Sequence, residues 1–218
     1  MGIIKIKTIK IISLFGIFGA IFYFIHIIFG RIFYEDYSPF SQAISDLTAQ
    51  GSPSRQVSSI YSFLYGIFTV TFSVVFFIYF KGVINKFITI GSCIFCMMTI
   101  ISFFGYTFFP LTESGYAGEF HDRMHVLITI FVVIFTIISI ILYSIGFIKS
   151  KNYKYLGIIS IFTFLLLVTG AMLINILPIE YFGIAQRINV YSLIIYTGIL
   201  SLWMFYYVKN NGVRTNVA

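Results

Sequence analysis

The residues best suited to chemistry include a pair of histidines, His121 and His125. If this segment is helical, the two imidazoles lie one turn apart on the same face. Such a pair supplies half of a zinc site, which needs one or two further ligands, and Asp46, Glu113 or His26 are the candidates. The pair beside a carboxylate also suits general acid and base chemistry. The alternative is structural, with both rings hydrogen-bonded to loop backbone or to lipid headgroups.

Arginine and glutamine residues offer a second chemistry, the binding of anions. Arg187 can hold a phosphate or a carboxylate through two parallel N–H bonds, which lysine cannot do. Gln186 precedes it, and Arg123 lies between the two histidines. The alternative role for these arginines is to form ion pairs with acidic residues such as Asp46 and Asp122, which would hold loops together.

The amino-acid composition indicates which class of protein carries these residues. Hydrophobic residues make up 59% of the 218-residue chain and charged residues 10%, whereas a soluble domain carries about 25% charged residues. This composition cannot cover a water-facing surface. It therefore excludes a soluble enzyme, a disordered chain and a nucleic-acid-binding module.

Six apolar stretches are each long enough to cross a bilayer, which takes about 20 helical residues. They must be helices, because a backbone in lipid has to satisfy its polar groups within its own segment. We expect an all-α, single-domain integral membrane six-helix bundle. The expected spans are 9–29, 58–80, 87–109, 124–148, 155–177 and 190–208.

The charges between the spans predict an orientation. One set of loops carries ten Lys and Arg residues and no acid, and the other carries four Arg residues and all seven acids. Lysine and arginine collect on the cytoplasmic side of membrane proteins. Both termini are therefore expected in the cytoplasm, and the candidate residues above on the extracytoplasmic face of a plasma membrane.

The first extracytoplasmic loop predicts a structure of its own. Ser38 and Pro39 resemble a helix start, and Gly51 resembles a helix stop. The apolar positions between them follow the spacing of one helical face: Phe40, Ala43, Ile44 and Leu47. We expect a short amphipathic helix that either covers helix ends or forms the wall of a cavity, with Asp46 facing inward.

Several small residues within the spans have a simpler interpretation. Cys93 and Cys96 have the C-x-x-C spacing but lie inside a span, so we expect them to be packing residues. Five glycines are expected to let helices approach closely: Gly16, Gly19, Gly66, Gly170 and Gly198.

Three fragments together resemble a known family. They are Ser41-x-x-x-Ser45-Asp46-Leu47, Phe109-Pro110 ahead of His121-Asp122-x-x-His125, and Gly183-x-x-Gln186-Arg187. The chain resembles the bacterial six-span proteins of domain of unknown function 998 and, more distantly, the DRAM-like membrane proteins. The resemblance implies a six-helix bundle with its signature residues on the outer face, and it supplies no catalytic role.

These observations support one leading function and two alternatives. The leading expectation is a polar extracytoplasmic pocket that binds a lipid headgroup or an envelope precursor, using Arg123, Arg187, Gln186 and Glu113. The first alternative is a membrane-embedded lipid hydrolase or transferase. In it His121, His125 and Asp46 hold zinc, or Ser45 attacks as a nucleophile. The second alternative is a small-molecule transporter, which the lack of charged residues in mid-span disfavours.

Overall fold

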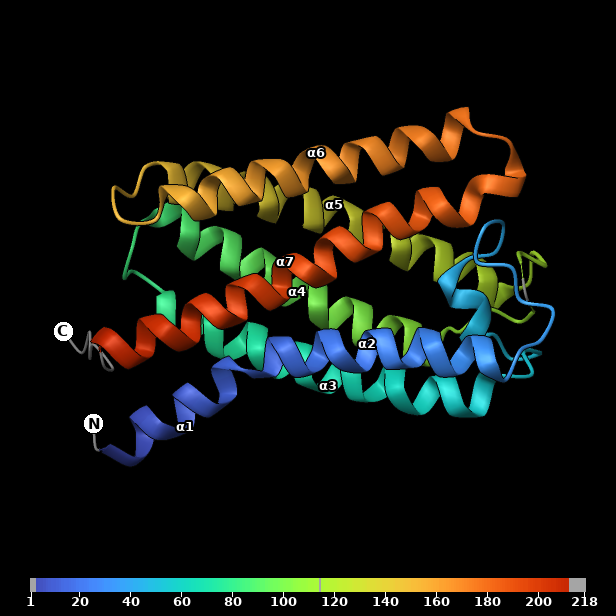
Figure 1. Cartoon of the computed structure of the whole chain (residues 1–218), viewed down its shortest axis with the longest axis horizontal. Helices are drawn as coiled ribbons and strands as arrows, with labels where there is room; N and C mark the ends of the chain where they lie inside the picture. Colours follow the sequence, from blue (N-terminus) through green and yellow to red (C-terminus); the bar gives the residue numbers. More distant parts are fainter. Residues whose placement is uncertain (1–2, 114, 212–218) are drawn as a thin grey trace.

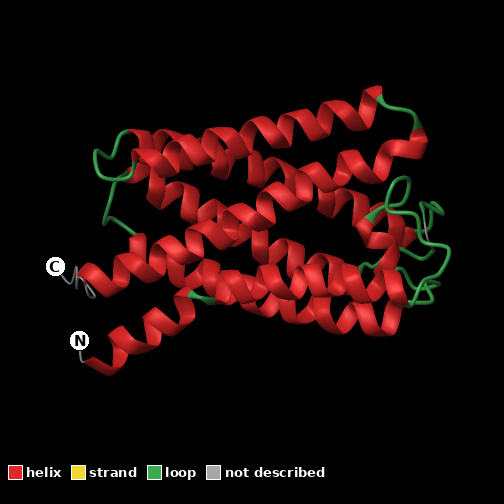
Figure 2. Cartoon of the chain, in the orientation of Figure 1, coloured by secondary structure: helices red, strands yellow, loops and turns green. Residues whose placement is uncertain are grey.

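The computed structural model describes residues 3–113 and 115–211, and all regular elements in these two stretches are helical (Figure 2). Six segments are long and apolar enough to cross a membrane, which confirms the expected all-α six-span architecture. The α-helices are α1 (Ile3–Ser13), α2 (Phe15–Ile32), α3 (Arg55–Phe80), α4 (Lys86–Phe108), α5 (Phe120–Ile148), α6 (Lys154–Ile176) and α7 (Phe182–Asn211).

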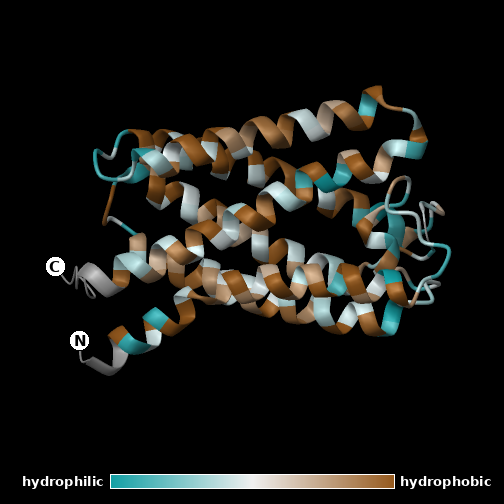
Figure 3. Cartoon of the chain, viewed as in Figure 1, coloured by the Kyte–Doolittle hydropathy of each residue, from teal (hydrophilic) through white to brown (hydrophobic). Residues whose placement is uncertain are grey.

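The bundle has two chemically different ends (Figure 1). Helix α1 begins and α7 ends at one of them, together with the turns 81–85 and 149–153, and we call it the terminal end. The opposite end, the loop end, contains the segments 33–54, 109–113, 115–119 and 177–181. Hydrophilic residues concentrate at both ends, and hydrophobic residues cover the helices between them (Figure 3). Which end faces the cytoplasm stays a prediction from the lysine distribution.

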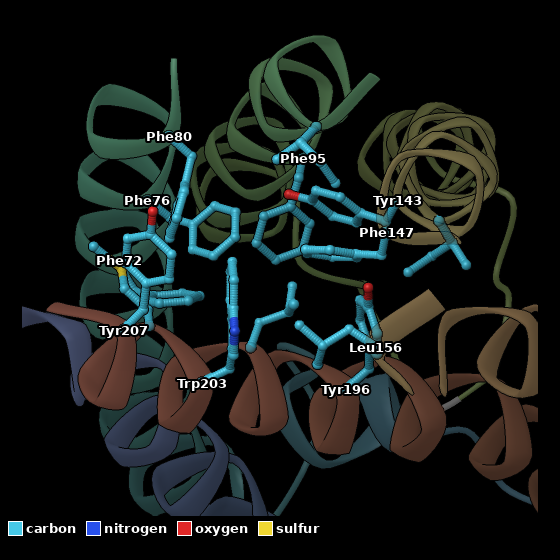
Figure 4. Packing of buried hydrophobic residues seen from close by; sticks show 14 of the residues in the cluster. Phe72, Phe76, Phe80, Phe95, Tyr143, Phe147, Leu156, Tyr196, Trp203 and Tyr207 are labelled. Carbon is cyan, nitrogen blue, oxygen red and sulfur yellow. The ribbon is translucent and has the colours of Figure 1, made fainter. Parts of the chain in front are cut away.

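Helices that follow one another in the chain pack side by side, from α2 to α7, and α7 also packs against α2. The terminal end contains an aromatic core (Figure 4). The ring of Trp203 stacks on that of Phe80 with their centroids 4.8 Å apart, and Phe147 meets the indole edge-on at 5.2 Å. Aromatic rings packed against one another fill the interior of this half of the bundle. The more polar features of the interior lie towards the loop end.

The first span is broken at Leu14, where α1 ends and α2 begins. Ser201 of α7 explains the break, because its Oγ donates to the carbonyl of Ser13 at 2.5 Å and accepts from the amide of Ile17 at 3.1 Å. One hydroxyl group thereby satisfies two backbone groups that a continuous helix would pair internally. The sequence predicted an unbroken span here.

Two further expectations about the elements were wrong. The first loop forms only a short 3₁₀ helix, η1 (Ile44–Thr48), instead of a helix over 39–50. Residues 182–189, expected in a loop, form the first two turns of α7. Both differences have the same cause, because side chains of α7 form hydrogen bonds with the backbone of the first loop.

The glycine predictions hold at four positions. An added Cβ would meet Ser201 at Gly16, Thr69 at Gly19, Phe103 at Gly66 and Asn189 at Gly170. At Gly198 it would meet nothing within 4 Å among the described residues, so this glycine does not mark a helix contact.

Candidate functional site

Arg187 lies in the second turn of α7 and binds the first loop. Its side chain is only 9% exposed. Nη1 donates to the carbonyl oxygens of Gln42 at 3.0 Å and Gly183 at 2.8 Å, and Nη2 donates to the phenol oxygen of Tyr37. The hydroxyl group of Tyr37 in turn donates a hydrogen bond to the carbonyl oxygen of Ala43 at 2.9 Å. The guanidinium therefore ties α7 to the loop through neutral oxygens, not through the carboxylates expected from the sequence.

Neighbouring residues of α7 extend this attachment. Gln186 accepts a hydrogen bond from the amide of Ile44 at 2.9 Å. At Gly183 an added Cβ would lie 2.6 Å from each of two loop carbonyl oxygens, so the close approach requires glycine. We call this set of contacts, from Tyr37, Gln42 and Ile44 to Gly183, Gln186 and Arg187, the α7 latch.

Burial widens the pH range over which the Tyr37 phenol of the latch stays protonated. It raises the pKa of the Tyr37 phenol to about 12, and the positive charge of Arg187 lowers that pKa against the trend. Tyr37 is therefore neutral at physiological pH, and it can donate to Ala43 while it accepts from Arg187.

Asp46 joins the first loop to the segment ahead of α5. It is 3% exposed, and its Oδ2 accepts from the amide of Ala43 at 3.1 Å. Its Oδ1 accepts from the amide of Gly115 at 3.1 Å. A buried carboxylate stabilises the fold only when its oxygens are hydrogen-bonded, and both oxygens of Asp46 meet backbone donors here.

Asp122 has a similar role at the start of α5. Its side chain is fully buried. Its Oδ1 accepts from the amide of Thr112 at 2.7 Å, and its Oδ2 accepts from the amide of Glu119 at 3.2 Å. The acid at the third helical position thus accepts from the N-cap amide of α5 and also binds the segment ahead of the helix through Thr112.

The two histidines lie one turn apart on α5, as expected, but each contacts a different part of the loop end. His121 Nδ1 is 3.1 Å from Nε2 of Gln50. His125 Nδ1 is 3.0 Å from the carbonyl oxygen of Phe109. A carbonyl can only accept, so His125 carries its proton on Nδ1.

The remaining predicted residues do not converge on this pair. In residues 3–113 and 115–211, no three His, Cys, Asp or Glu side chains form a group that could hold a metal ion, so His121, His125 and Asp46 are not brought together as a ligand set. Glu113 and Arg123 are exposed, and Arg123 Nε donates to the Gly118 carbonyl at 3.0 Å. Ser45 is half-buried in η1. Three predicted residues do lie together at the first loop. Gln186 and Arg187 form hydrogen bonds to the backbone of this loop from α7, and Asp46, a loop residue, accepts from the loop amide of Ala43.

A cleft of about 280 Å³ lies beside this assembly, between α3 and α4. Thr48, Arg55 and Pro110 line it at the loop end, which we call its mouth, and Thr69, Met98 and Thr99 line it furthest from that end. From Arg55 to Thr69 the distance along α3 is about 21 Å at 1.5 Å per residue. The cleft therefore descends to about the middle of the span.

Nine of the fifteen residues that line the cleft bear a hydroxyl group, although most of its exposed surface is apolar, and the exposed Arg55 is the one charged residue among the described residues that line it. The rings of Phe63 and Phe103 lie 5.3 Å apart along it, and Phe103 packs over Gly66. The hydroxyl-bearing residues are Thr48, Ser59, Ser62, Tyr65, Thr69, Thr99, Ser102, Tyr106 and Thr107.

Thr69, at the inner end of the cleft, also contacts another helix. It is 5% exposed, and an added Cβ at Gly19 of α2 would lie 2.5 Å from its Oγ1. Its hydroxyl group therefore faces α2, and Thr69 closes the cleft on the inner side.

The sequence analysis missed the cleft, although a signal was present. Arg55, Ser59, Ser62, Gly66 and Thr69 recur at the spacing of one helical face within an otherwise apolar span. A second, shorter stripe on α4 consists of Thr99, Ser102 and Tyr106. Tyr37 and Gln42 of the latch had no comparable signal, because their partners lie about 145 residues further along the chain.

Comparisons with known proteins identify a family and nothing more specific. No curated protein and no solved structure matches the chain. One family model, described as protein of unknown function DUF998, matches residues 17–203, which extend from the start of α2 well into α7. Because this match covers most of the chain and includes at least part of each of the six spans, the protein belongs to the DUF998 family of multi-pass membrane proteins.

Proposed function

We propose that the protein binds an anionic lipid, or a lipid-linked envelope precursor, in the α3–α4 cleft from the outer leaflet of the plasma membrane. Arg55 would hold the anionic group at the mouth. The observation that carries the proposal is the combination of one exposed cation at the loop end with a hydroxyl-lined wall that continues into the span.

The chemistry of the wall favours a ligand with polar groups over a plain acyl chain. Some of these hydroxyl groups already donate within the chain, as those of Thr99 and Thr107 do to helix carbonyl groups. The glycerol, ester or sugar oxygens of a headgroup can bond to those of Ser59, Ser62 and Ser102, which line the same wall. The guanidinium of Arg55 adds a fork of donors suited to a phosphate or a carboxylate.

The latch contributes to this proposal as a support for the mouth. Thr48 lines the cleft from η1, and η1 is held by the contacts of Asp46, Gln186 and Arg187. These three residues would therefore position the wall of the site without touching the ligand. The outer-leaflet assignment rests on the lysines of the terminal end, which the positive-inside rule puts in the cytoplasm.

Lipid retention tests the proposal. The protein is purified in mild detergent from its own membrane, and the lipids that remain bound are identified by mass spectrometry. Two variants change the site in different ways, because Arg55→Gln removes the positive charge and Ser62→Leu fills the cleft. We expect an anionic lipid to be retained by the unaltered protein and to fall about tenfold in Arg55→Gln, as the loss of one charge-assisted hydrogen bond implies. Retention should also fall in Ser62→Leu, because the leucine side chain occupies the space of the ligand.

Thr71→Leu is the matched control, because Thr71 lies on the same helix outside the cleft and donates to its own helix at the carbonyl of Ile67. It should retain lipid as the unaltered protein does. Equal retention by Arg55→Gln, Ser62→Leu and Thr71→Leu would refute the proposal.

A further inference from the structure

We propose a second lipid site at the terminal end, in a groove between α5 and α6 that takes an acyl chain of an anionic phospholipid. The groove measures about 400 Å³. Its walls consist of four isoleucines together with Ser144 and Phe164, and Lys149 lies at its end. This site is separate from the α3–α4 cleft and does not depend on the function proposed for it.

The groove is preformed by a close contact between the two helices. At Gly157 of α6, an added Cβ would lie 2.8 Å from the backbone nitrogen of Ile148. The helices therefore touch one residue away from Lys149. Ile145 and Ile161 further along the groove are 37% and 43% exposed, so their side chains face the surrounding hydrocarbon.

The walls suit a hydrocarbon chain better than a polar group. The hydroxyl of Ser144 is already used, because its Oγ donates to the Ile140 carbonyl at 2.8 Å. The groove therefore presents aliphatic and aromatic carbon to its occupant. The α3–α4 cleft differs from it, because nine hydroxyl-bearing residues line that cleft and Ser144 is the one in the groove among the described residues.

The positive charge at the end of the groove favours a ligand with an anionic group. Lys149 is exposed, and its Nζ lies 4.4 Å from the centre of the Phe87 ring, which keeps the ammonium close to the helix ends. The segments 81–86 and 149–154 contain five lysines and no Asp or Glu. An acyl chain in the groove would bring its phosphate to this positive end, and basic pockets between membrane helices bind anionic headgroups in this way.

Native mass spectrometry separates this site from the cleft. The full-length protein is equilibrated with mixed micelles of phosphatidylglycerol and phosphatidylcholine that carry identical acyl chains, and the retained lipids are counted. We expect phosphatidylglycerol to be retained in preference. Lys149→Gln should lower its occupancy at one site about fivefold or more, and Arg55→Gln should leave that site unchanged.

Two further variants make the result decisive. Lys151→Gln removes an equivalent lysine that does not line the groove, and it should leave lipid retention unchanged. Ile161→Trp fills the groove without changing the charge, and it should expel the same lipid as Lys149→Gln. The inference is overturned by equal losses in Lys149→Gln and Lys151→Gln, by retention in Ile161→Trp, or by equal retention of the two phospholipids in the unaltered protein.

Discussion

At the scale of the residue, burial separates arginines that the sequence presents as equivalent. Arg187 is almost fully buried, and its donors are used by Tyr37 and by two carbonyl groups, so its role is to hold the loop. Arg123 and Arg55 are exposed, and Arg55 lies at the mouth of a cleft. From the sequence, Arg187 and Arg123 were both candidates for anion binding. A sequence pattern does not show which groups a side chain contacts, so the structural role of Arg187 could not be predicted.

The role of Arg187 predicts a stability effect that depends on its shape as well as its charge. A lysine cannot reach Tyr37, Gln42 and Gly183 together, so Arg187→Lys should lower the free energy of unfolding by about 2 kcal/mol. Thermal unfolding in detergent, followed with a thiol-reactive dye on the buried Cys96, measures the change. Arg123→Lys is the control and should cost less than about 0.5 kcal/mol. Equal shifts in the two variants would contradict the latch.

Tyr37 predicts a pH dependence with a defined sign. Below pH 10 the phenol is protonated in both the folded and the unfolded chain, so its contribution to stability is complete. Folding raises the pKa of this phenol from 10.0 to about 12, so the unfolded chain loses the proton first as the pH rises through that interval. The free energy of unfolding should therefore fall by up to about 2 kcal/mol.

Tyr37→Phe isolates this effect from the other tyrosines, since it lacks the ionisable group. The stability difference between the unaltered protein and Tyr37→Phe should be constant from about pH 7 to pH 9 and should narrow above about pH 10. Thermal unfolding scans of both proteins across this range provide the test. Parallel curves throughout would show that Tyr37 does not ionise differently in the two states.

At the scale of the element, the long helices follow from the sequence and the connecting segments do not. A run of about 20 apolar residues specifies a span in a bilayer, and five of the six spans lie within a few residues of their expected starts and ends. The first loop and the start of α7 were assigned wrongly, because each takes its structure from the other through the latch. The hydroxyl stripe of α3 was visible, but its meaning depends on the gap between α3 and α4.

Close packing of η1 against α2 predicts an effect of substitution at Gly30. An added Cβ at this position would lie 2.6 Å from Ser58 Oγ and 2.9 Å from Leu47 Cδ1. Gly30→Val should therefore displace η1 and lower the free energy of unfolding by about 1–3 kcal/mol. Gly198→Ala, where nothing described lies within 4 Å, should leave stability unchanged or raise it slightly. The same thermal assay compares the two, and a neutral Gly30→Val would contradict the packing.

At the scale of the whole molecule, the two halves of the bundle differ in the side chains that fill their interior. Aromatic rings fill the interior of the terminal half, and the α3–α4 cleft occupies the loop half. Composition and charge alone predicted the six spans and the unequal ends. The position of the cleft needed the structure, because a cavity arises from how neighbouring helices pack rather than from the sequence of either helix.

The predicted orientation is tested by labelling intact cells. In a chain with both native cysteines replaced by serine, single cysteines are placed at the exposed positions Glu113 and Lys151, at opposite ends of the bundle. A membrane-impermeant maleimide should label Glu113→Cys in intact cells and Lys151→Cys only after lysis. The reverse pattern would place the cleft in the inner leaflet.

Photocrosslinking in the native membrane tests the central claim most directly. A photoreactive amino acid replaces Ser62 inside the α3–α4 cleft, and another replaces Thr71, which lies on the same helix outside it. After illumination, mass spectrometry identifies the attached lipid. The account predicts one class of anionic lipid on position 62 and the mixture of bulk lipids on position 71. The same mixture at both positions, or no lipid on position 62, would contradict it.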